Sequence, residues 1–272
     1  DVISKLINVN MLSSFISSVP SKFDNILNDA NDPMGVDVAD IDSVWLACNG
    51  AIYLTNKVYS PTAYISVSFP ALINETMRIL YWGIEQLQYD VYLNSLNTYY
   101  SFFIPTNNSM LEYIDPVSYG KSKTQLYRFY YDKTKVNKEQ RVWASIWNYD
   151  TETGMVLDSV GKTTDVNVIK NRLKDILETH IVIGNVEDGR TYYRTKGGTE
   201  IRVSNVAAGA NGMTVEGSYQ INEGHPLPVT TIYDQTQGNG KSYILDGQPI
   251  LGTRMTVHDV LASREEFSEF YN

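Results

Sequence analysis

The chain has 272 residues, of which 43% are hydrophobic, so it is long enough to bury one large core or two ordinary ones. Its 22 basic and 31 acidic residues give a net charge of −9, and the basic residues are scattered along the chain, which argues against nucleic acid as a partner. No apolar stretch approaches the roughly 20 residues that a bilayer-spanning helix needs. We therefore expect a folded, soluble protein that does not span a membrane.

Residues 1–28 carry apolar residues at helical spacing and predict one or two short helices. The acidic stretch that follows, residues 28–42, matches an EF-hand loop only in part, because Pro33 stands at the fifth position and Gly35 falls one place late. We favour a solvated loop over a calcium site there.

A short motif then occurs twice in the chain. Asn49-Gly50-Ala51-Ile52-Tyr53 returns as Asn239-Gly240-Lys241-Ser242-Tyr243. A turn dipeptide before an alternating apolar run is typical of a β-hairpin. Because both copies have the character of a domain end, residues 1–61 are predicted to finish one unit and residues 62–253 to form a second. The single cysteine, Cys48, precedes the first copy and is expected to be a small buried residue.

Between the two copies the apolar period changes. Residues 69–96 have apolar side chains three or four apart, which predicts one apolar helical face. Residues 98–104 indicate a strand that ends at Pro105, and residues 106–109 offer capping side chains for a short helix over residues 110–114.

Residues 125–131 and 141–149 are aromatic and strand-like, and the charged segment 132–140 joins them. The alternation in the second run predicts a hairpin with an aromatic face. Such a face is suited to recognition, although its tryptophans could instead cover the core or an adjoining domain. The candidate contact residues are Trp143, Trp147, Tyr149, Tyr127, Tyr130 and Tyr131.

Residues 165–179 restore helical spacing, with Asp165 as the expected N-cap. The chain then reads as short strands separated by glycine-rich turns as far as residue 245. The last stretch, residues 257–272, is predicted to be helical. This succession indicates a mixed, β-rich fold with helices.

Three segments resemble the signatures of fasciclin (FAS1) domains, in the order of that family. Residues 100–109 resemble the strand that runs into Ala-Pro-Thr-Asn, and residues 173–184 are similar to the leucine-rich helix and its Tyr-His-Ile-Val-Pro-Gly motif. Residues 239–246 are similar to the closing Asn-Gly-Val-Ile-His-Val-Ile-Asp. The structural residues that the resemblance implies are Pro105, Thr106, Asn107, His180, Gly184, Asn239, Gly240, Tyr243 and Asp246.

The sequence departs from these signatures at three positions. Ile104 stands in place of the alanine, Thr179 in place of the tyrosine and Ile183 in place of the proline. Each segment is weak alone, but as a set they cover residues 62–253.

The resemblance implies an α+β fold, a FAS1-like β-wedge with a mixed β-sandwich core flanked by helices. Residues 1–61 would then be the C-terminal part of a preceding fasciclin-like domain, as in tandem bacterial cell-surface members. The segment of about residues 121–160 has no counterpart in the family and looks like an inserted β-hairpin. Residues 254–272 would be a terminal helix or the start of a further unit.

The sequence offers no catalytic group, cofactor site or metal site. His180, His225 and His258 lack the spacing of metal ligands. The Gly-Lys-Ser of residues 240–242 imitates a phosphate-binding loop but leads into a strand-like run instead of a helix. By the resemblance, His180 is a structural residue whose imidazole bonds the backbone.

The resemblance therefore implies a non-enzymatic extracytoplasmic protein, at the cell surface or in the periplasm, that mediates adhesion or binds extracellular protein or glycan. We expect it to be tethered, as a lipoprotein is, through a segment that precedes Asp1. One alternative is a small-ligand-binding protein or enzyme that uses a cleft near His180 or the acidic loop of residues 29–42. Another is a structural spacer whose hairpin packs against the neighbouring domain.

Overall fold

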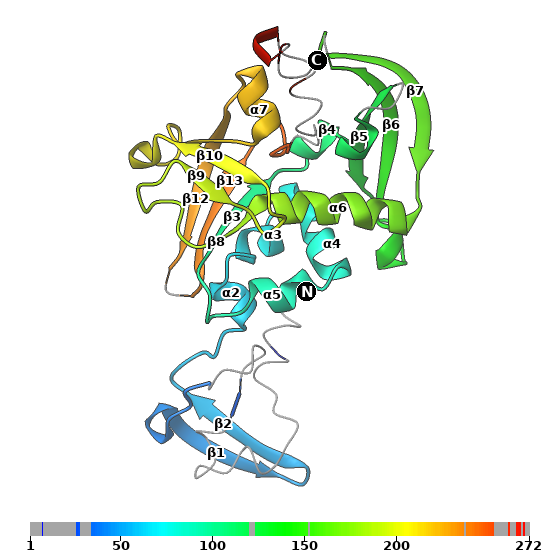
Figure 1. The fold of residues 1–272 in the computed structure, drawn as a ribbon. Helices are drawn as coiled ribbons and strands as arrows, with labels where there is room; N and C mark the ends of the chain where they lie inside the picture. Colours follow the sequence, from blue (N-terminus) through cyan, green and yellow to red (C-terminus); the bar gives the residue numbers. More distant parts are fainter. Residues whose placement is uncertain are drawn as a thin grey trace.

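The computed structural model describes residues 7, 26–27, 34–119, 123–151, 153–236, 238–252, 261, 265–267 and 269. The helices predicted within residues 1–28 and 257–272 lie largely outside the described residues, and so does the first part of the acidic stretch, residues 28–33. The described chain forms a mixed body of two sheets and several helices, from which a two-stranded hairpin projects (Figure 1). The predicted α+β class is confirmed.

The projecting hairpin contains the first copy of the repeated motif. Strand β1, Ile41–Ala47, follows the 3-10 turn η3, Val38–Asp40, and pairs antiparallel with β2, Gly50–Thr55. The hairpin prediction is confirmed. The expectation for Cys48 is wrong, because the residue is exposed at the tip of the turn.

Helices open the body. The predicted face over residues 69–96 is broken into short helices, because Asn74 is extended (φ −93°, ψ 125°) and Gln88 is left-handed (φ 58°). Val91, which the pattern placed on the apolar face, is 77% exposed. The helices are α2 Thr62–Ile65, α3 Phe69–Ile73, η4 Glu75–Met77, α4 Arg78–Gln86 and α5 Tyr89–Leu93.

The larger sheet has seven strands in the order β8-β3-β13-β12-β11-β10-β9. Strands β3 and β13 run parallel, and the other strand pairs described in this sheet are antiparallel. Every residue of β3 is buried, as expected of a central strand. The strands are β3 Tyr100–Pro105, β8 Ile181–Ile183, β9 Tyr192–Arg194, β10 Glu200–Ser204, β11 Thr214–Glu216, β12 Leu227–Gln235 and β13 Gly240–Leu245.

The second sheet extends the predicted insertion. The hairpin of residues 121–160 is present, but it belongs to a four-stranded sheet in the order β4-β5-β6-β7. The helix predicted over residues 110–114 is instead a 3-10 turn, η5 Ser109–Leu111, followed by the first of these strands. The strands are β4 Tyr113–Ile114, β5 Thr124–Tyr131, β6 Val142–Asp150 and β7 Met155–Thr163, and 3-10 turns lie at η6 Pro116–Ser118 and η7 Lys138–Gln140.

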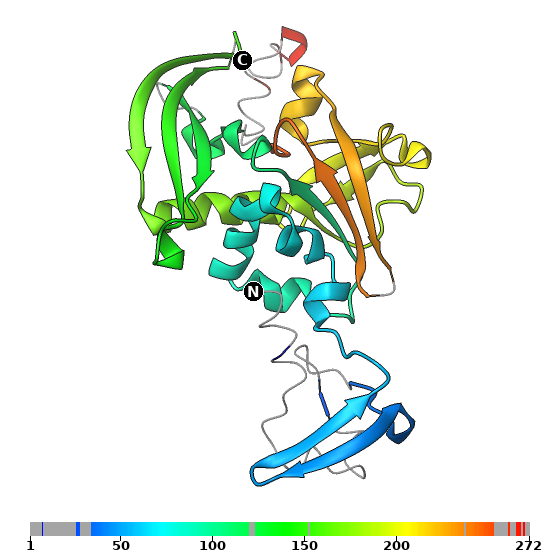
Figure 2. The same cartoon turned by 180° about the vertical axis from the view of Figure 1, so that it is seen from behind.

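Helix α6, Val166–His180, links the two sheets, and Asp165 caps it by accepting hydrogen bonds from the backbone of Asn167 and Val168, as predicted. Helices α4 and α6 lie between the sheets (Figures 1 and 2). The remaining described elements are η8 Val206–Ala208, α7 Ser218–Glu223 and η9 Glu265–Phe267.

The body has two hydrophobic clusters, one on each face of β3 and β13. The main core joins the helices to both sheets and contains Leu80, Phe102, Phe129, Leu177 and Ile244. The second lies on the opposite face of the seven-stranded sheet and contains Phe103, Val203, Val215, Tyr243 and Leu245. Alternation along the strands explains the division, since successive side chains point to opposite faces.

Candidate binding surface

Two stacked aromatic rings lie on the outer face of the four-stranded sheet. The register of β5 and β6 places Tyr130 opposite Trp143. Their ring centroids are 4.5 Å apart with an interplanar angle of 22°, and both side chains are partly exposed. Stacked aromatic cross-strand pairs stabilise a sheet and present a rigid apolar surface. We call Tyr130 and Trp143 the aromatic platform.

Trp147 lies on the same face of β6 as Trp143, and its side chain makes more contacts with its neighbours. Its indole Nε1 donates to the Ser145 hydroxyl at 3.0 Å, and the Arg128 guanidinium lies 5.4 Å from its ring centroid. Trp147 and Tyr149 also pack against the main core. Burial and a hydrogen bond with Tyr149 raise the pKa of the Tyr219 phenol, which places Tyr149 among packed tyrosines.

Tyr127 lies on the opposite face of β5. It is 4% exposed, and its ring stacks on Phe129 with centroids 6.0 Å apart. The Arg172 guanidinium lies over the Tyr127 ring, 5.6 Å from its centroid. Because Tyr127 and Tyr130 are three positions apart on one strand, their side chains point to opposite faces. Tyr127 is therefore a core residue and is not part of the candidate surface. Tyr131 lies on the inner side too, where its hydroxyl accepts a hydrogen bond from Arg141 at 3.4 Å.

A groove of about 400 Å³ borders the platform. Tyr130 lines it together with Arg78 from α4, Asn108 from the loop after β3, and Lys133 from the loop after β5. Arg78 forms an ion pair with Glu75 at 2.8 Å, whereas the side chains of Asn108 and Lys133 are exposed. These segments are distant in the sequence, which is why no local pattern revealed the groove.

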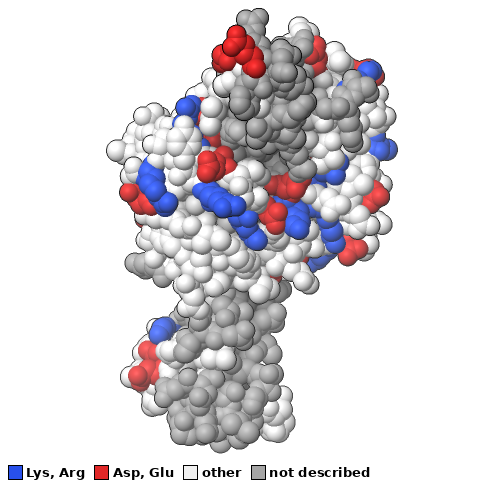
Figure 3. Space-filling view, in the orientation of Figure 1, with Lys and Arg blue, Asp and Glu red and all other residues white. Residues whose placement is uncertain are grey.

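The face of the molecule in Figure 3 carries Lys and Arg interspersed with Asp and Glu, without an extended area of one sign. Within the described residues, no group of three or more His, Cys, Asp or Glu is arranged to hold a metal ion. None of the described helices is both long and apolar enough to cross a membrane.

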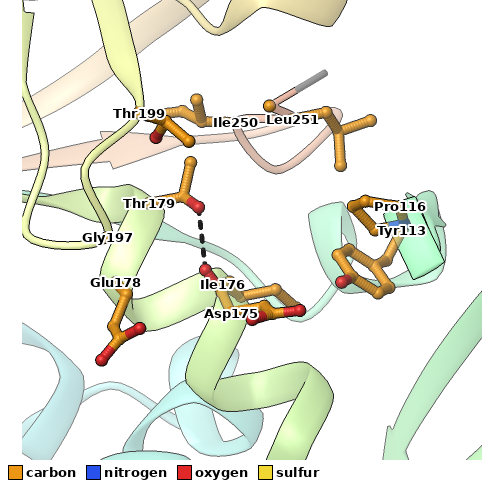
Figure 4. A pocket seen from close by; sticks show the side chains of 11 residues that line it. Tyr113, Pro116, Asp175, Ile176, Glu178, Thr179, Gly197, Thr199, Ile250 and Leu251 are labelled. Atoms are coloured by element: carbon orange, nitrogen blue, oxygen red, sulfur yellow. Dashed lines mark hydrogen bonds between the residues drawn. The ribbon is translucent and has the colours of Figure 1, made fainter. Parts of the chain in front are cut away.

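A smaller pocket of about 100 Å³ lies beside α6, near His180 (Figure 4). Its walls include Asp175, Glu178 and Thr179 of the helix and Ile250 and Leu251 of the segment after β13. The Thr179 hydroxyl donates to the Asp175 carbonyl at 2.8 Å, and Figure 4 shows the Glu178 carboxylate turned away from Ile250 and Leu251. Few polar side chains therefore converge in this pocket, as a ligand site would require.

His180 itself is fully buried. Its Nδ1 lies 2.6 Å from the Ile176 carbonyl oxygen, and its Nε2 accepts the Ile250 amide at 2.9 Å, so the proton belongs on Nδ1. Burial lowers the pKa of the imidazole to about 4. With both nitrogens bonded to backbone, His180 holds the end of α6 to the segment after β13, which is the role that the resemblance implies for it.

The signature residues of β3 and β13 meet at the strand ends. The Thr106 hydroxyl donates to the Asp246 carboxylate at 2.8 Å, next to the last β3–β13 pair, Pro105 and Leu245. Asn107 accepts the Ile79 amide at 3.1 Å and so fixes the start of α4.

At the other end of β13, the buried Asn239 side chain accepts the Val67 amide at 2.8 Å and donates to the carbonyls of Leu93 and Ser95 at 2.6 and 2.9 Å. Gly240 has a φ of +141°, and a Cβ there would overlap the Tyr100 carbonyl.

Two more signature residues tie this sheet together. The Tyr243 hydroxyl donates to Glu187 at 2.9 Å, and its ring stacks on Phe103 with centroids 5.0 Å apart. The Gly184 amide donates to the Tyr99 carbonyl at 2.8 Å, with a φ of +125°. The three signature segments therefore lie side by side in β8, β3 and β13.

Neither a protein-family model nor a curated protein sequence matches the chain. A solved structure of a FAS1 domain pair from the insect cell adhesion molecule Fasciclin I is similar at 15% identity with a TM-score of 0.39, over 76% of this chain. The chain spans 57% of the length of that structure's chain.

Proposed function

We propose that the chain is a non-enzymatic, fasciclin-like module outside the cytoplasm that binds an extracellular glycan through the aromatic platform and the groove beside it. The fasciclin assignment is supported by the three signature segments and by their meeting in adjacent strands. The family resemblance adds three points to this proposal. They are a role in adhesion, a location at the cell surface or in the periplasm, and a tandem organisation with a lipid anchor.

The observation that carries the proposal is the partly exposed Tyr130–Trp143 stack on the four-stranded sheet. Flat aromatic surfaces with polar tips are common at binding interfaces, where tyrosine, tryptophan and arginine dominate the energetics. Tyr130 also lines the groove, so the platform is continuous with the side chains of Arg78, Asn108 and Lys133. The groove volume falls within the range of about 300–1,000 Å³ that is usual for ligand sites.

A small-ligand carrier or enzyme near His180 has less support. The pocket there is about 100 Å³, below the usual range for ligand sites, and both imidazole nitrogens are committed to backbone groups. A general base needs a free nitrogen within hydrogen-bond reach of its substrate.

A spacer role for the aromatic hairpin also has less support. The described hairpin β1–β2 lies at the end of the molecule away from β6 (Figures 1 and 2). Strand β6, which contains Trp143, is thus remote from that hairpin.

Binding of the intact chain to an array of glycans and matrix proteins tests the proposal. Trp143→Ala and Tyr130→Ala should each weaken binding to a glycan by at least about tenfold, as expected for central aromatic contacts, and leave a cooperative thermal transition. Tyr192→Ala is the matched control, because Tyr192 is a 54% exposed aromatic on strand β9.

Four outcomes contradict the proposal. Silence across the whole array would remove the binding function, and binding to proteins alone would remove the glycan as the ligand. Undiminished binding by both platform variants would move the site elsewhere. Loss of the thermal transition in Trp143→Ala would show that Trp143 is a core residue.

A further inference from the structure

The groove beside the aromatic platform adjoins a second, smaller cavity of about 20 Å³, with which it shares Arg78 and Tyr131. The walls of the two together contain more basic than acidic residues, although the chain as a whole has 22 basic and 31 acidic ones. The basic residues are Arg78, Lys133, Lys138 and Arg141, and the acidic ones are Glu75 and Glu85. Positive charge is therefore concentrated beside the platform, where it would attract an anionic ligand.

The acidic side chain of the groove itself is already paired. One carboxylate oxygen of Glu75, Oε1, accepts hydrogen bonds from Nε and Nη2 of Arg78 at 3.2 and 2.8 Å. The hydrogen bond from Arg78 holds the pKa of Glu75 below its usual value, and the charge of Lys133 lowers it further. Lys133 is exposed and forms no ion pair with any residue that the structure describes. Its ammonium is thus available to an anionic group.

The loop that carries Lys133 is held in place by its own hydrogen bonds. The Asp132 carboxylate accepts the amide and the hydroxyl of Thr134 at 2.9 and 2.6 Å, so both neighbours of Lys133 are fixed. Further along the loop, the Trp82 indole of α4 donates to the Lys138 carbonyl at 2.6 Å. A loop that is ordered before the ligand arrives reduces the entropic cost of binding.

Tyr130 connects the platform to these charges. It stacks on Trp143 and also lines the groove, and Lys133 follows it by three residues in the wall of the same groove. A sugar ring stacked on the platform would therefore direct the substituents of one edge toward the groove. A neutral hydroxyl there would form an ordinary hydrogen bond with the ammonium, whereas an anionic group would form a charge-assisted one, which is roughly twice as strong.

We propose that the glycan bound at the platform is acidic, and that its carboxylate or sulfate group enters the groove and binds the Lys133 ammonium. This inference rests on the proposed function, because it assigns the chemical class of the glycan to the same site. Single-stranded nucleic acid also combines flat rings with negative charge, but it needs a basic groove that follows several phosphates. The net charge of −9 outside so small a basic region opposes such a polyanion.

The test compares two matched pairs of probes by calorimetry with the intact chain, at about 0.15 M salt. One pair is an oligogalacturonate and its neutral methyl ester, and the other is a sulfated galactan oligosaccharide and its desulfated form. We expect the acidic member of at least one pair to bind about tenfold more tightly. A preference in the first pair alone assigns the groove to carboxylates, and one in the second pair alone assigns it to sulfates.

Variants of the loop locate the preference. Lys133→Ala should reduce the ratio of the two affinities to less than about threefold, and Lys133→Arg should restore it. Lys135→Ala is the matched control, because it removes the same charge from an exposed residue of the same loop that lines neither cavity. The control should retain the ratio of the original chain.

Four results would overturn the inference. They are equal binding within both pairs, an unaltered ratio in Lys133→Ala, an equal loss in Lys135→Ala, and binding of a short single-stranded oligonucleotide as tight as that of the acidic sugars. Equal binding that Trp143→Ala weakens would leave the proposed function in place. Absence of glycan binding from the whole array would remove both.

Discussion

At the scale of single residues, Gly240 shows how tightly β3 and β13 are joined. Its positive φ and the neighbouring Tyr100 carbonyl both exclude a side chain. Gly184 has a similar φ, +125°, but no described atom lies within 4 Å of its Cβ position. Gly184→Ala should therefore cost only the conformational strain, about 1–3 kcal/mol, while Gly240→Ala should cost at least about 2 kcal/mol more because the backbones must separate. Urea unfolding of both variants measures the difference, and equal costs would contradict the close approach.

His180 should make stability depend on pH. Its pKa is lowered from 6.5 to about 4 by burial, so the unfolded state binds more protons between these two values. Stability is then complete above about pH 6.5 and falls by about 3 kcal/mol as the pH drops to about 4. His180→Gln, which does not titrate, should flatten the dependence in this window when unfolding free energies are measured at several pH values. A slope that survives the substitution would assign the effect to other groups.

At the scale of elements, the repeated motif offers an internal control. Asn239→Ala removes three buried hydrogen bonds that join the β12–β13 turn to the helical layer, and should destabilise the chain by about 3 kcal/mol. Asn49→Ala changes the equivalent but exposed position and should fall within about 0.5 kcal/mol of the original chain. Chemical denaturation measures both. Similar losses at the two positions would show that the asparagine acts through its turn alone.

Short sequence patterns predicted the elements that are determined by side chains close to one another in the sequence. The hairpin turns, the Asp165 cap of α6 and the short strands after it all follow from side-chain chemistry within a few residues. The sequence did not predict the interruption at Gln88, because a left-handed non-glycine residue leaves no sequence signal. The sequence did not predict strand β7 for another reason. An edge strand that is exposed at most positions needs no alternation of apolar and polar residues.

The candidate site was predictable only in part. Alternation within residues 141–149 indicated the aromatic face, and the same period along β5 separates Tyr127 from Tyr130. The groove combines Arg78, Asn108 and Lys133 from three segments. Their proximity depends on how α4 packs against β5, which single-sequence periodicity does not encode.

At the scale of the whole molecule, the four-stranded sheet that contains the aromatic platform lies away from the β1–β2 hairpin (Figures 1 and 2). We therefore expect a ligand on the platform to leave that hairpin uncontacted.

The most direct test of the binding surface is a hydrogen-exchange footprint of the intact chain with the glycan that binds it most tightly on the array. We predict slowed exchange in β5 and β6 and in the groove segments that carry Arg78 and Asn108. We predict unchanged exchange around the pocket of Asp175 and Leu251. Protection centred on that pocket, or the absence of any bound glycan, would contradict binding at the platform.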